Sequence, residues 1–273
     1  MKKRILILVI AGICITSCYS QTIQTADKKP NIIIIFTDDH GYSDLSCQGV
    51  YDDVKTPNID KLAESGVRMK SGYVTAPQCV PSRAGLISGQ YQNRFGLESN
   101  NNYRDVAAMR KFDQLQTIPE RLQKVGYITG MAGKWHLGSN KSDKISQHGF
   151  DKAFFKHSNV PGHWNMNLDG KDMVPQVQNG GGYHLDLISS FACSFIERYK
   201  EQPFFFYLAY RAPHVPLDAP QKYLDRFPGE MPERRRQALA MLSAVDDGVG
   251  KIVETLKENG LEENTIIFIM GDN

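Results

Sequence analysis

The stretch that decides the fold is Asn31–Tyr42, N-I-I-I-I-F-T-D-D-H-G-Y. Its first part, Asn31–Phe36, is a run of mostly β-branched apolar residues, which is typical of a strand buried on both faces. The pattern returns near the end of the chain as T-I-I-F-I-M at Thr265–Met270, followed by G-D-N. We therefore expect two buried strands that each run directly into acidic or amide side chains.

Helical and strand patterns alternate between these two strands. The first expected helix is Thr56–Ser65, with Thr56 as its cap and Pro57 in its first turn. The others are a helix with Pro81 in its first turn that continues through Ala84–Ser88, and Thr117–Val125, Leu185–Tyr199 and Arg234–Asn259. Further strands are expected at Tyr127–Ala132 and Pro203–Tyr210. This alternation predicts an α/β fold with a mostly parallel sheet and helices on both faces. In such sheets ligands bind beyond the carboxyl ends of the strands.

The polar residues after the two outer strands form a candidate metal site. Asp38 and Asp39 follow the first strand, and Asp272 and Asn273 follow the last. Grouped on one sheet edge, these side chains would repel one another unless a cation lay among them. Oxygen ligands suit a hard ion, Ca²⁺ or Mg²⁺, rather than zinc. The alternative is that strand ends are acidic because loops are polar, but two such pairs favour the metal site.

The N-terminus predicts export. A basic M-K-K-R start precedes an apolar stretch, Ile5–Ile15, that is short for a membrane span. The following small residues before Cys18 resemble a bacterial lipobox, in which the cysteine is lipidated after cleavage. We expect residues 1–17 to be a lipoprotein signal peptide and residues 18–30 a tether, which would make the chain a periplasmic or outer-membrane, cell-surface lipoprotein of a bacterium. An ordinary signal peptide cut nearby is the alternative.

Charge and cysteine content narrow the class further. Lys+Arg total 32 and Asp+Glu 30, a formal net charge of +2, so no nucleic-acid partner is expected. After loss of the signal peptide and lipidation of Cys18, the remaining cysteines are Cys47, Cys79 and Cys193. Export permits disulfides, and Cys47 and Cys193 either pair or are buried separately.

Cys79 lies in A-P-Q-C-V-P-S-R-A-G-L-I-S-G, residues 76–89, at the start of an expected helix. A cysteine there can be a packing residue, half of a disulfide, a metal ligand or a nucleophile. The helix start offers free N–H groups and the positive end of the helix dipole, which favour an anionic nucleophile or substrate. Arg83, one turn on, can point back to the same place.

Two further segments supply cationic or hydrogen-bonding groups. G-K-W-H-L-G places Lys134 and His136 two apart after a strand, and A-P-H-V-P places His214 after another. A single histidine is usually structural. Two histidines at strand ends, together with a lysine, favour an anion pocket.

The combined motifs resemble the type I sulfatases of the alkaline phosphatase superfamily. C-V-P-S-R followed by A-G-L-I-S-G resembles the signature C-x-P-S-R-x-x-L-x-x-G. The resemblance extends through P-N-I-I-I-I-F-T-D-D, T-P-N-I-D-K-L-A-E-S-G-V, G-K-W-H-L-G, A-P-H-V-P-L and G-D-N, and so covers residues 31–273.

The resemblance implies a role for each site residue. Cys79 would be oxidised to formylglycine by a formylglycine-generating maturase and would act as the hydrated aldehyde. Ca²⁺, with Mg²⁺ as the less favoured ion, would be held by Asp38, Asp39, Asp272 and Asn273. Arg83 would orient the diol, Lys134 and His214 would bind sulfate, and His136 would contact the diol and take a proton.

Other residues are placed less firmly by the resemblance. His40 would be structural or a substrate contact, and Gln78 and Gly180–Gly182 would line the pocket. Asn100–Tyr103 and Gly162–Trp164 are candidate sugar contacts, although an ordinary loop role is the preferred interpretation. Members of the family continue past the D-N pair, so residues 31–273 are expected to be an incomplete catalytic domain without the C-terminal subdomain.

The expected activity is therefore hydrolysis of a sulfuric ester on a sulfated polysaccharide or glycosaminoglycan. One alternative is a phosphonate or phosphate ester hydrolase of the same superfamily. The other is an inactive, truncated lipoprotein that binds sulfated glycan without cleaving it.

Overall fold

The computed structural model describes residues 28–138, 142–156, 164–167 and 182–273. Its strands are β1 Asn31–Asp38, β2 Ile128–Gly133, β3 Lys152–Lys156, β4 Trp164–Asn167, β5 Phe204–Pro213 and β6 Thr265–Gly271. Its helices are α1 Pro57–Ser65, α2 Cys79–Ser88, α3 Val106–Asp113, α4 Ile118–Gln123, α5 Ser142–Gln147, α7 His184–Tyr199, α8 Gln221–Leu224 and α9 Glu233–Glu258. The predicted signal peptide and Cys18, with the tether up to residue 27, lie outside the described residues.

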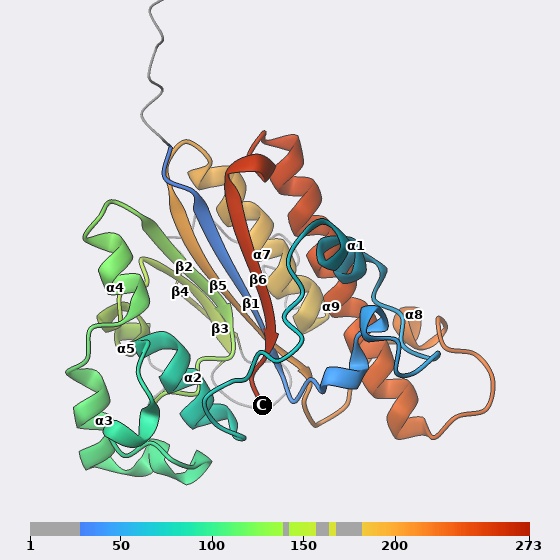
Figure 1. The fold of residues 1–273 in the computed structure, drawn as a ribbon, viewed down its shortest axis with the longest axis horizontal. Coiled ribbons are helices and arrows are strands. Elements are labelled where there is room, and N and C mark those ends of the chain that lie inside the picture. The colour runs from blue at the N-terminus through green and yellow to red at the C-terminus, as the bar shows by residue number, and fades with distance from the viewer. Residues whose placement is uncertain (1–27, 139–141, 157–163, 168–181) are drawn as a thin grey trace, which may run out of the picture.

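The strands form one sheet in the order β4-β3-β2-β5-β1-β6 (Figure 1). Every neighbouring pair is parallel except β3 with β4. The expected mostly parallel sheet is confirmed. β1 lies between β5 and β6, which explains its nearly uninterrupted apolar sequence.

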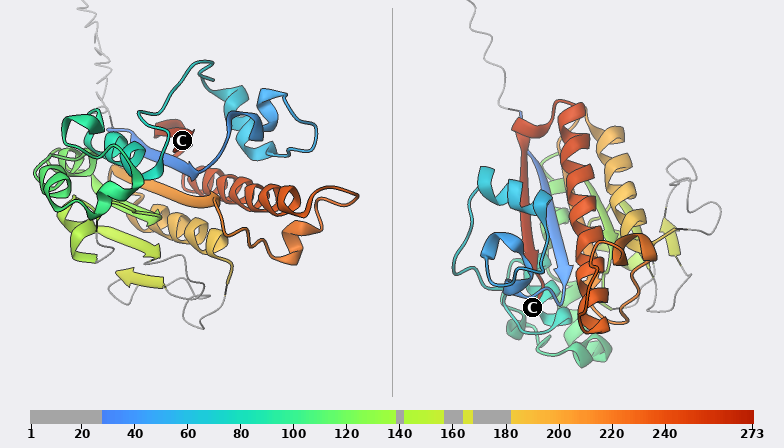
Figure 2. Two further views of the ribbon diagram at one scale, coloured as in Figure 1. Left: turned by 90° about the horizontal axis from the view of Figure 1, so that it is seen from below. Right: turned by 90° about the vertical axis from the view of Figure 1, so that its right-hand side faces the viewer.

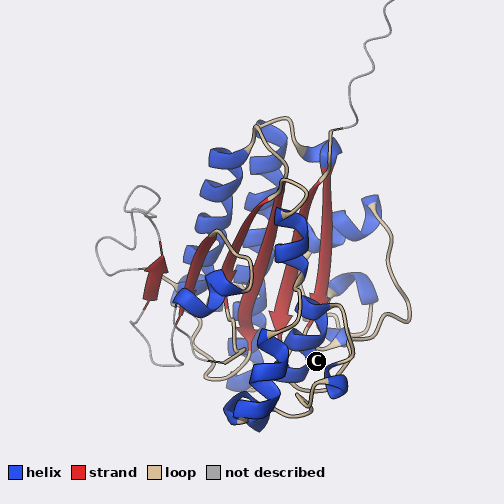
Figure 3. Cartoon of the chain, turned by 90° about the vertical axis from the view of Figure 1, so that its left-hand side faces the viewer, coloured by secondary structure: helices blue, strands red, loops and turns tan. Residues whose placement is uncertain are grey.

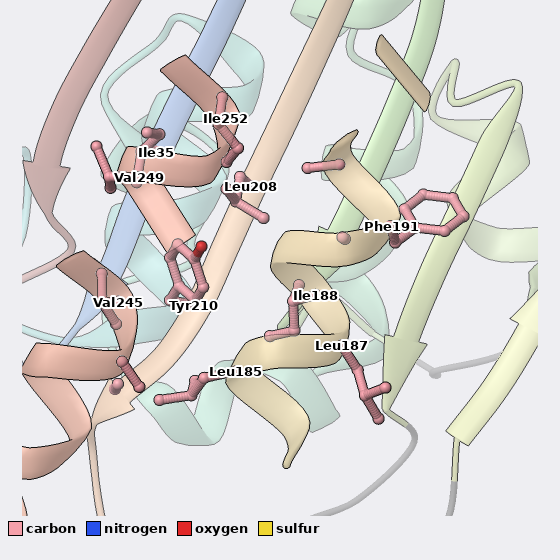
Figure 4. Close-up of a cluster of buried hydrophobic side chains, with 14 of the residues drawn as sticks. Ile35, Leu185, Leu187, Ile188, Phe191, Leu208, Tyr210, Val245, Val249 and Ile252 are labelled. Atoms are coloured by element: carbon pink, nitrogen blue, oxygen red, sulfur yellow. The ribbon is translucent and has the colours of Figure 1, made fainter. Parts of the chain in front are cut away.

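Helices cover both faces of the sheet, as predicted (Figures 2 and 3). On one face, α7 and α9 lie side by side and pack on β5 and β1. Figure 4 shows their apolar side chains, such as Ile188 and Val249, meeting Leu208 and Ile35. On the other face, α2 and α3 contribute Val80, Ala84 and Phe112 to a second buried cluster. The two clusters fix the sheet between two layers of helix.

The predicted elements exist, with ends that differ by a few residues. The strand at Thr265–Met270 is not buried as predicted, because β6 lies at the edge of the sheet and its residues are half-buried or exposed. The largest difference is in β5, which continues beyond Tyr210 to Pro213. The helix predicted to have Pro81 in its first turn and to continue through Ala84–Ser88 is confirmed as α2, which begins at Cys79. The sequence analysis missed α3, α5, α8, β3 and β4, which are all short.

The start of α1 is held differently from the prediction. Thr56 makes no capping hydrogen bond, because its hydroxyl bonds Ser46 and Asp60 instead. Asp246 of α9 takes over this role, accepting the backbone N–H groups of Asn58 at 3.0 Å and Ile59 at 2.9 Å. A carboxylate at a helix N-terminus satisfies otherwise unpaired donors. Asp246 therefore ties α1 to α9.

Two other features bear on the sequence analysis. Cys47, Cys79 and Cys193 are all free thiols, so the possible Cys47–Cys193 disulfide is not formed. Among the described residues, no helix combines the length and hydropathy that a membrane span requires.

Candidate active site

The predicted polar cluster forms where β1 and β6 end side by side. Thr37 pairs with Gly271 in the parallel ladder, and the Asp272 N–H donates to the Thr37 carbonyl at 2.8 Å. The Asp39 N–H then donates to Asp272 Oδ1 at 3.1 Å. Asn273 Nδ2 lies 3.2 Å from Asp39 Oδ1. The structure thus brings together all four residues predicted at this edge, at the lower end of the sheet in Figure 1.

A tight turn begins at Asp39, directly after Asp38, the last residue of β1. Asp39 has φ 56°, a left-handed conformation that aspartate tolerates better than most residues. The turn packs directly on the neighbouring strand, since a Cβ added to Gly271 would lie 2.6 Å from the His40 carbonyl oxygen. His40 is buried and its ring bonds the Thr37 hydroxyl and the Asp44 carbonyl, both at 2.9 Å. Of its two predicted roles, His40 has the structural one.

Two cationic side chains contact the buried carboxylates. Arg83 is fully buried, and its Nη2 donates to Asp38 Oδ1 at 3.2 Å and to Asp272 Oδ2 at 2.5 Å. Lys134 Nζ donates to both oxygens of Asp38 at 2.7 Å. Both cations therefore lie within the predicted site but face its carboxylates. Their predicted contacts with the nucleophile and with sulfate stay predictions.

Burial and these cations set the protonation of the carboxylates. Burial raises the pKa of Asp38, but Arg83 and Lys134 outweigh it and hold that pKa well below the usual range. The pKa of Asp272 rises to about 6, because burial and the nearby Asp38 charge outweigh Arg83. Two buried carboxylates this close are costly to ionise together without additional positive charge.

The donor set fits a bound cation. Ligand atoms of Asp38, Asp39, Cys79 and His214 all lie within 4.8 Å of one another. Asp272 and Asn273 adjoin this group through their bonds to Asp39. The carboxylate oxygens match a hard ion, whereas the thiol and imidazole do not. Asp272, whose pKa is raised by burial, is the group that a divalent ion would most relieve.

Cys79 is the first residue of α2 and points toward this cluster. Its side chain is buried, and Asn273 Nδ2 lies 3.7 Å from its Sγ. Burial raises the pKa of the thiol to about 11, so it is protonated at neutral pH and is a weak nucleophile as cysteine. The sequence predicted free N–H groups at this helix start. One of them is not free, because the Val80 N–H donates to Asn100 Oδ1 at 2.9 Å.

Both predicted histidines lie beside the same cluster. His214 Nε2 is 3.6 Å from Asp39 Oδ2, and its Nδ1 faces the Val215 carbonyl at 2.5 Å. His136 has φ 59° and is half-buried. Burial, together with the charges of Lys134 and Arg83, lowers the pKa of His136 to about 3. His136 is therefore neutral and able to accept a proton only if its surroundings change.

Several site residues were not recognised in the sequence. Tyr207 of β5 accepts a hydrogen bond from Arg83 Nη1 at 3.3 Å, deep in the core. Its position in P-F-F-F-Y-L-A-Y gives no indication of which face it occupies. Gln78, predicted to line the pocket, precedes Cys79 and accepts from Asn100 N at 2.7 Å.

Two of the candidate sugar contacts, Asn100 and Asn102, make local hydrogen bonds, and some of the others lie outside the described residues. Asn100 caps α2, and Asn102 closes a local turn by accepting from Ser99 N at 2.7 Å. These hydrogen bonds support the preferred loop role of the two asparagines, and a contact with sugar stays a prediction. Residues 162–163 and 180–181 lie outside the described residues, while Gly182 is exposed just before α7.

Comparison with known proteins gives a consistent result. The sulfatase family model matches residues 30–273. Arylsulfatase J of Mus musculus is 33% identical over 259 residues, covering 90% of the chain and 43% of that protein. N-acetylgalactosamine-6-sulfatase of Homo sapiens is 30% identical over 272 residues, covering 91% of the chain and 50% of that protein. The chain thus spans about half the length of these relatives.

A solved structure shares the fold closely. Ps i-CgsB, crystallised in complex with k-i-k-neocarrahexaose, superposes with a TM-score of 0.78 at 33% identity. The match covers 90% of the chain and 59% of that protein.

Proposed function

Because the chain belongs to the sulfatase family, we propose that it hydrolyses a sulfuric ester of a carbohydrate with a formylglycine derived from Cys79 as nucleophile. The observation that carries the proposal is the position of Cys79. Its Sγ lies within 4.8 Å of ligand atoms of Asp38, Asp39 and His214, next to the buried Arg83 and Lys134. A group at this point can be activated and can meet an anionic ester at the same time.

The modification explains how a weak thiol becomes a strong nucleophile. A formylglycine-generating enzyme would supply the oxidant that converts Cys79 to an aldehyde, which then hydrates to a geminal diol. One diol oxygen attacks sulfur, the S–O bond to the sugar breaks, and the sugar alcohol leaves with a proton. The second hydroxyl then loses its proton, the aldehyde re-forms, and inorganic sulfate departs. A serine has no second hydroxyl and could not complete the last step.

The surrounding side chains would assist these steps. Lys134 contacts Asp38 and His214 lies beside Asp39, and both would bind sulfate oxygens and help the leaving group, while Arg83 would fix the diol. Burial holds His136 neutral, and the negative charge of a bound sulfate ester would raise its pKa, so that it could take the proton that triggers release of sulfate. Preorganised charge of this kind stabilises the transition state more than it stabilises the substrate.

A Ca²⁺ ion would be held by Asp38, Asp39, Asp272 and Asn273. When bound, it would lower the free-energy cost of negative charge on the diol oxygen. It would also compensate the buried carboxylates, which would leave Lys134 able to turn from Asp38 to the substrate.

Calcium is therefore expected to stabilise the protein. At a free concentration of 100 times its Kd, an ion that binds only the folded state raises the free energy of unfolding by about 2.7 kcal/mol. Thermal melts with Ca²⁺, with Mg²⁺ and with a chelator would measure the effect. We expect Ca²⁺ to raise the Tm more than Mg²⁺ does.

Two variants control this measurement. Asp39→Asn alters a half-exposed carboxylate of the site and should reduce the calcium shift. Asp52→Asn alters an exposed carboxylate in a nearby loop and should leave the shift intact. An equal calcium shift in the wild type and Asp39→Asn would count against this ligand set.

The direct test of the proposed function is made on protein expressed with and without a formylglycine-generating enzyme. The tryptic peptide Ser71–Arg83 is weighed, and release of sulfate from sulfated oligosaccharides is measured. We expect a lowered peptide mass, labelling by an aldehyde-reactive probe, and sulfate release only after coexpression. An unmodified thiol with undiminished sulfate release would overturn the proposal.

The substrate class and the cellular location of the protein are also proposals. Structural relatives include a protein solved with a neocarrahexaose and one solved with D-glucosamine-2-N,6-O-disulfate. We propose a sulfated polysaccharide or glycosaminoglycan for this chain. The basic, apolar and lipobox-like N-terminus supports export and anchoring through Cys18, with residues 31–273 as part of a catalytic domain.

A further inference from the structure

Arg211 lies at the rim of the candidate active site and has no role in the chemistry above. It is the eighth residue of β5, Phe204–Pro213. Its neighbours Tyr210 and Ala212 belong to the buried cluster on the α7 and α9 face. Because side chains alternate along a strand, Arg211 points to the opposite face, where Tyr207 bonds Arg83.

The pairing of β1 with β5 is irregular around Arg211. β1 advances from Phe36 to Asp38 while β5 advances from Ala209 to Pro213, so β5 carries extra residues here. Bulges of this kind interrupt the ladder and redirect a side chain, often next to an active site. In this chain the extra residues of β5 lie between Ala209 and Pro213 and include Arg211, beside the end of β1 that carries Asp38.

The charges that act on Arg211 are those of the site. Burial lowers its pKa, and the nearby charges of Asp38 and Asp218 oppose that effect. The charge of Arg83 lowers the pKa as well. A half-buried guanidinium in this position is stabilised by an anion that enters the site.

A second charged residue near Arg211 is Asp218. Asp218, which faces it electrostatically, has a carboxylate 4.0 Å from His184 Nδ1 at the start of α7. Asp218 is half-exposed. Arg211 and Asp218 are therefore charged groups near the site that are not among the residues proposed to bind the reacting sulfate.

We propose that Arg211 is a specificity-determining residue that binds a second anionic group of the substrate, a carboxylate or another sulfate on the sugar. This inference rests on the proposed function and adds the substrate class: sugars with at least one anion besides the sulfate that is cleaved. A guanidinium is suited to this role because its donors match a carboxylate or a sulfate in pairs.

Arg211→Gln and the wild type, both with Cys79 matured, are compared on three substrates. These are p-nitrophenyl sulfate, a sulfated disaccharide with a uronate, and a disulfated monosaccharide. We expect the variant to lose about 10- to 100-fold in kcat/KM on a substrate with the second anion, as for a lost charged hydrogen bond. The loss on p-nitrophenyl sulfate should stay within about 3-fold. The substrate that shows the loss identifies the second anion as carboxylate or sulfate.

Controls separate this effect from general damage. Arg211→Lys keeps the charge and should recover part of the loss, and Arg94→Gln changes an exposed arginine beyond the far end of α2 and should change nothing. Thermal melts establish that each variant is folded. Equal losses on all three substrates, no loss on any, or a wild type that cleaves only p-nitrophenyl sulfate would overturn the inference. If the wild type cleaves none of them, the proposed function fails as well.

Discussion

Replacement of Cys79 by alanine is expected to abolish sulfate release without unfolding the protein. Alanine cannot be converted to an aldehyde, so the attacking oxygen is lost and only the charged pocket remains. Removal of a catalytic nucleophile typically lowers kcat by on the order of 10⁴-fold or more. The measurement is kcat on a sulfated oligosaccharide, with a thermal melt of each variant. The melt should shift little, because the change removes one sulfur atom.

Two matched variants sharpen this result. Cys193→Ala changes another free cysteine, on α7 and remote from the sheet edge, and should retain full activity. Cys79→Ser keeps an attacking oxygen but lacks the second hydroxyl, so it should stop after one turnover with sulfate bound to the protein. Activity above a tenth of wild type in Cys79→Ala would show that the nucleophile lies elsewhere.

The part of the site that the sequence predicts is the part set by strand ends. Asp38 ends the buried strand β1 and Asp272 follows the edge strand β6, and parallel strands align such residues on one edge whatever the loops do. Cys79 could be placed for a similar reason, because the residues around it predict a helix start. These positions depend on local pattern and on a general property of parallel sheets.

The residues that the sequence does not predict depend on contacts between distant segments. Asp246 caps α1 from a helix that follows it by nearly two hundred residues, so Thr56 was the only cap visible locally. The contacts of the buried Arg83 could not be predicted for the same reason. Arg83 was expected to face the nucleophile, but its complete burial against Asp38 and Asp272 follows from tertiary packing. Arg211 depends on a bulge that no sequence period reveals.

The largest expected loss of stability comes from Gly133→Ala. Gly133 ends β2 with φ 103°, a conformation that side chains rarely adopt. An added Cβ would lie 1.9 Å from the carbonyl oxygen of Ala209 on β5, and backbone in the middle of a sheet cannot move aside at little cost. Strain and overpacking together should lower the free energy of unfolding by about 4 kcal/mol. Denaturant titration of both proteins measures this difference.

The same change should also disturb the site, because the residue that follows Gly133 is Lys134. The Lys134 N–H donates to the Ala209 carbonyl at 2.8 Å, and its Nζ contacts Asp38. A shift of β2 away from β5 would therefore move a proposed sulfate ligand. Gly126→Ala is the matched control, since Gly126 has φ 89° but nothing within 4 Å of an added Cβ. That variant should lose about 1 kcal/mol, from backbone strain alone. If both variants lost the same stability, the close approach of β2 to β5 would not be the cause.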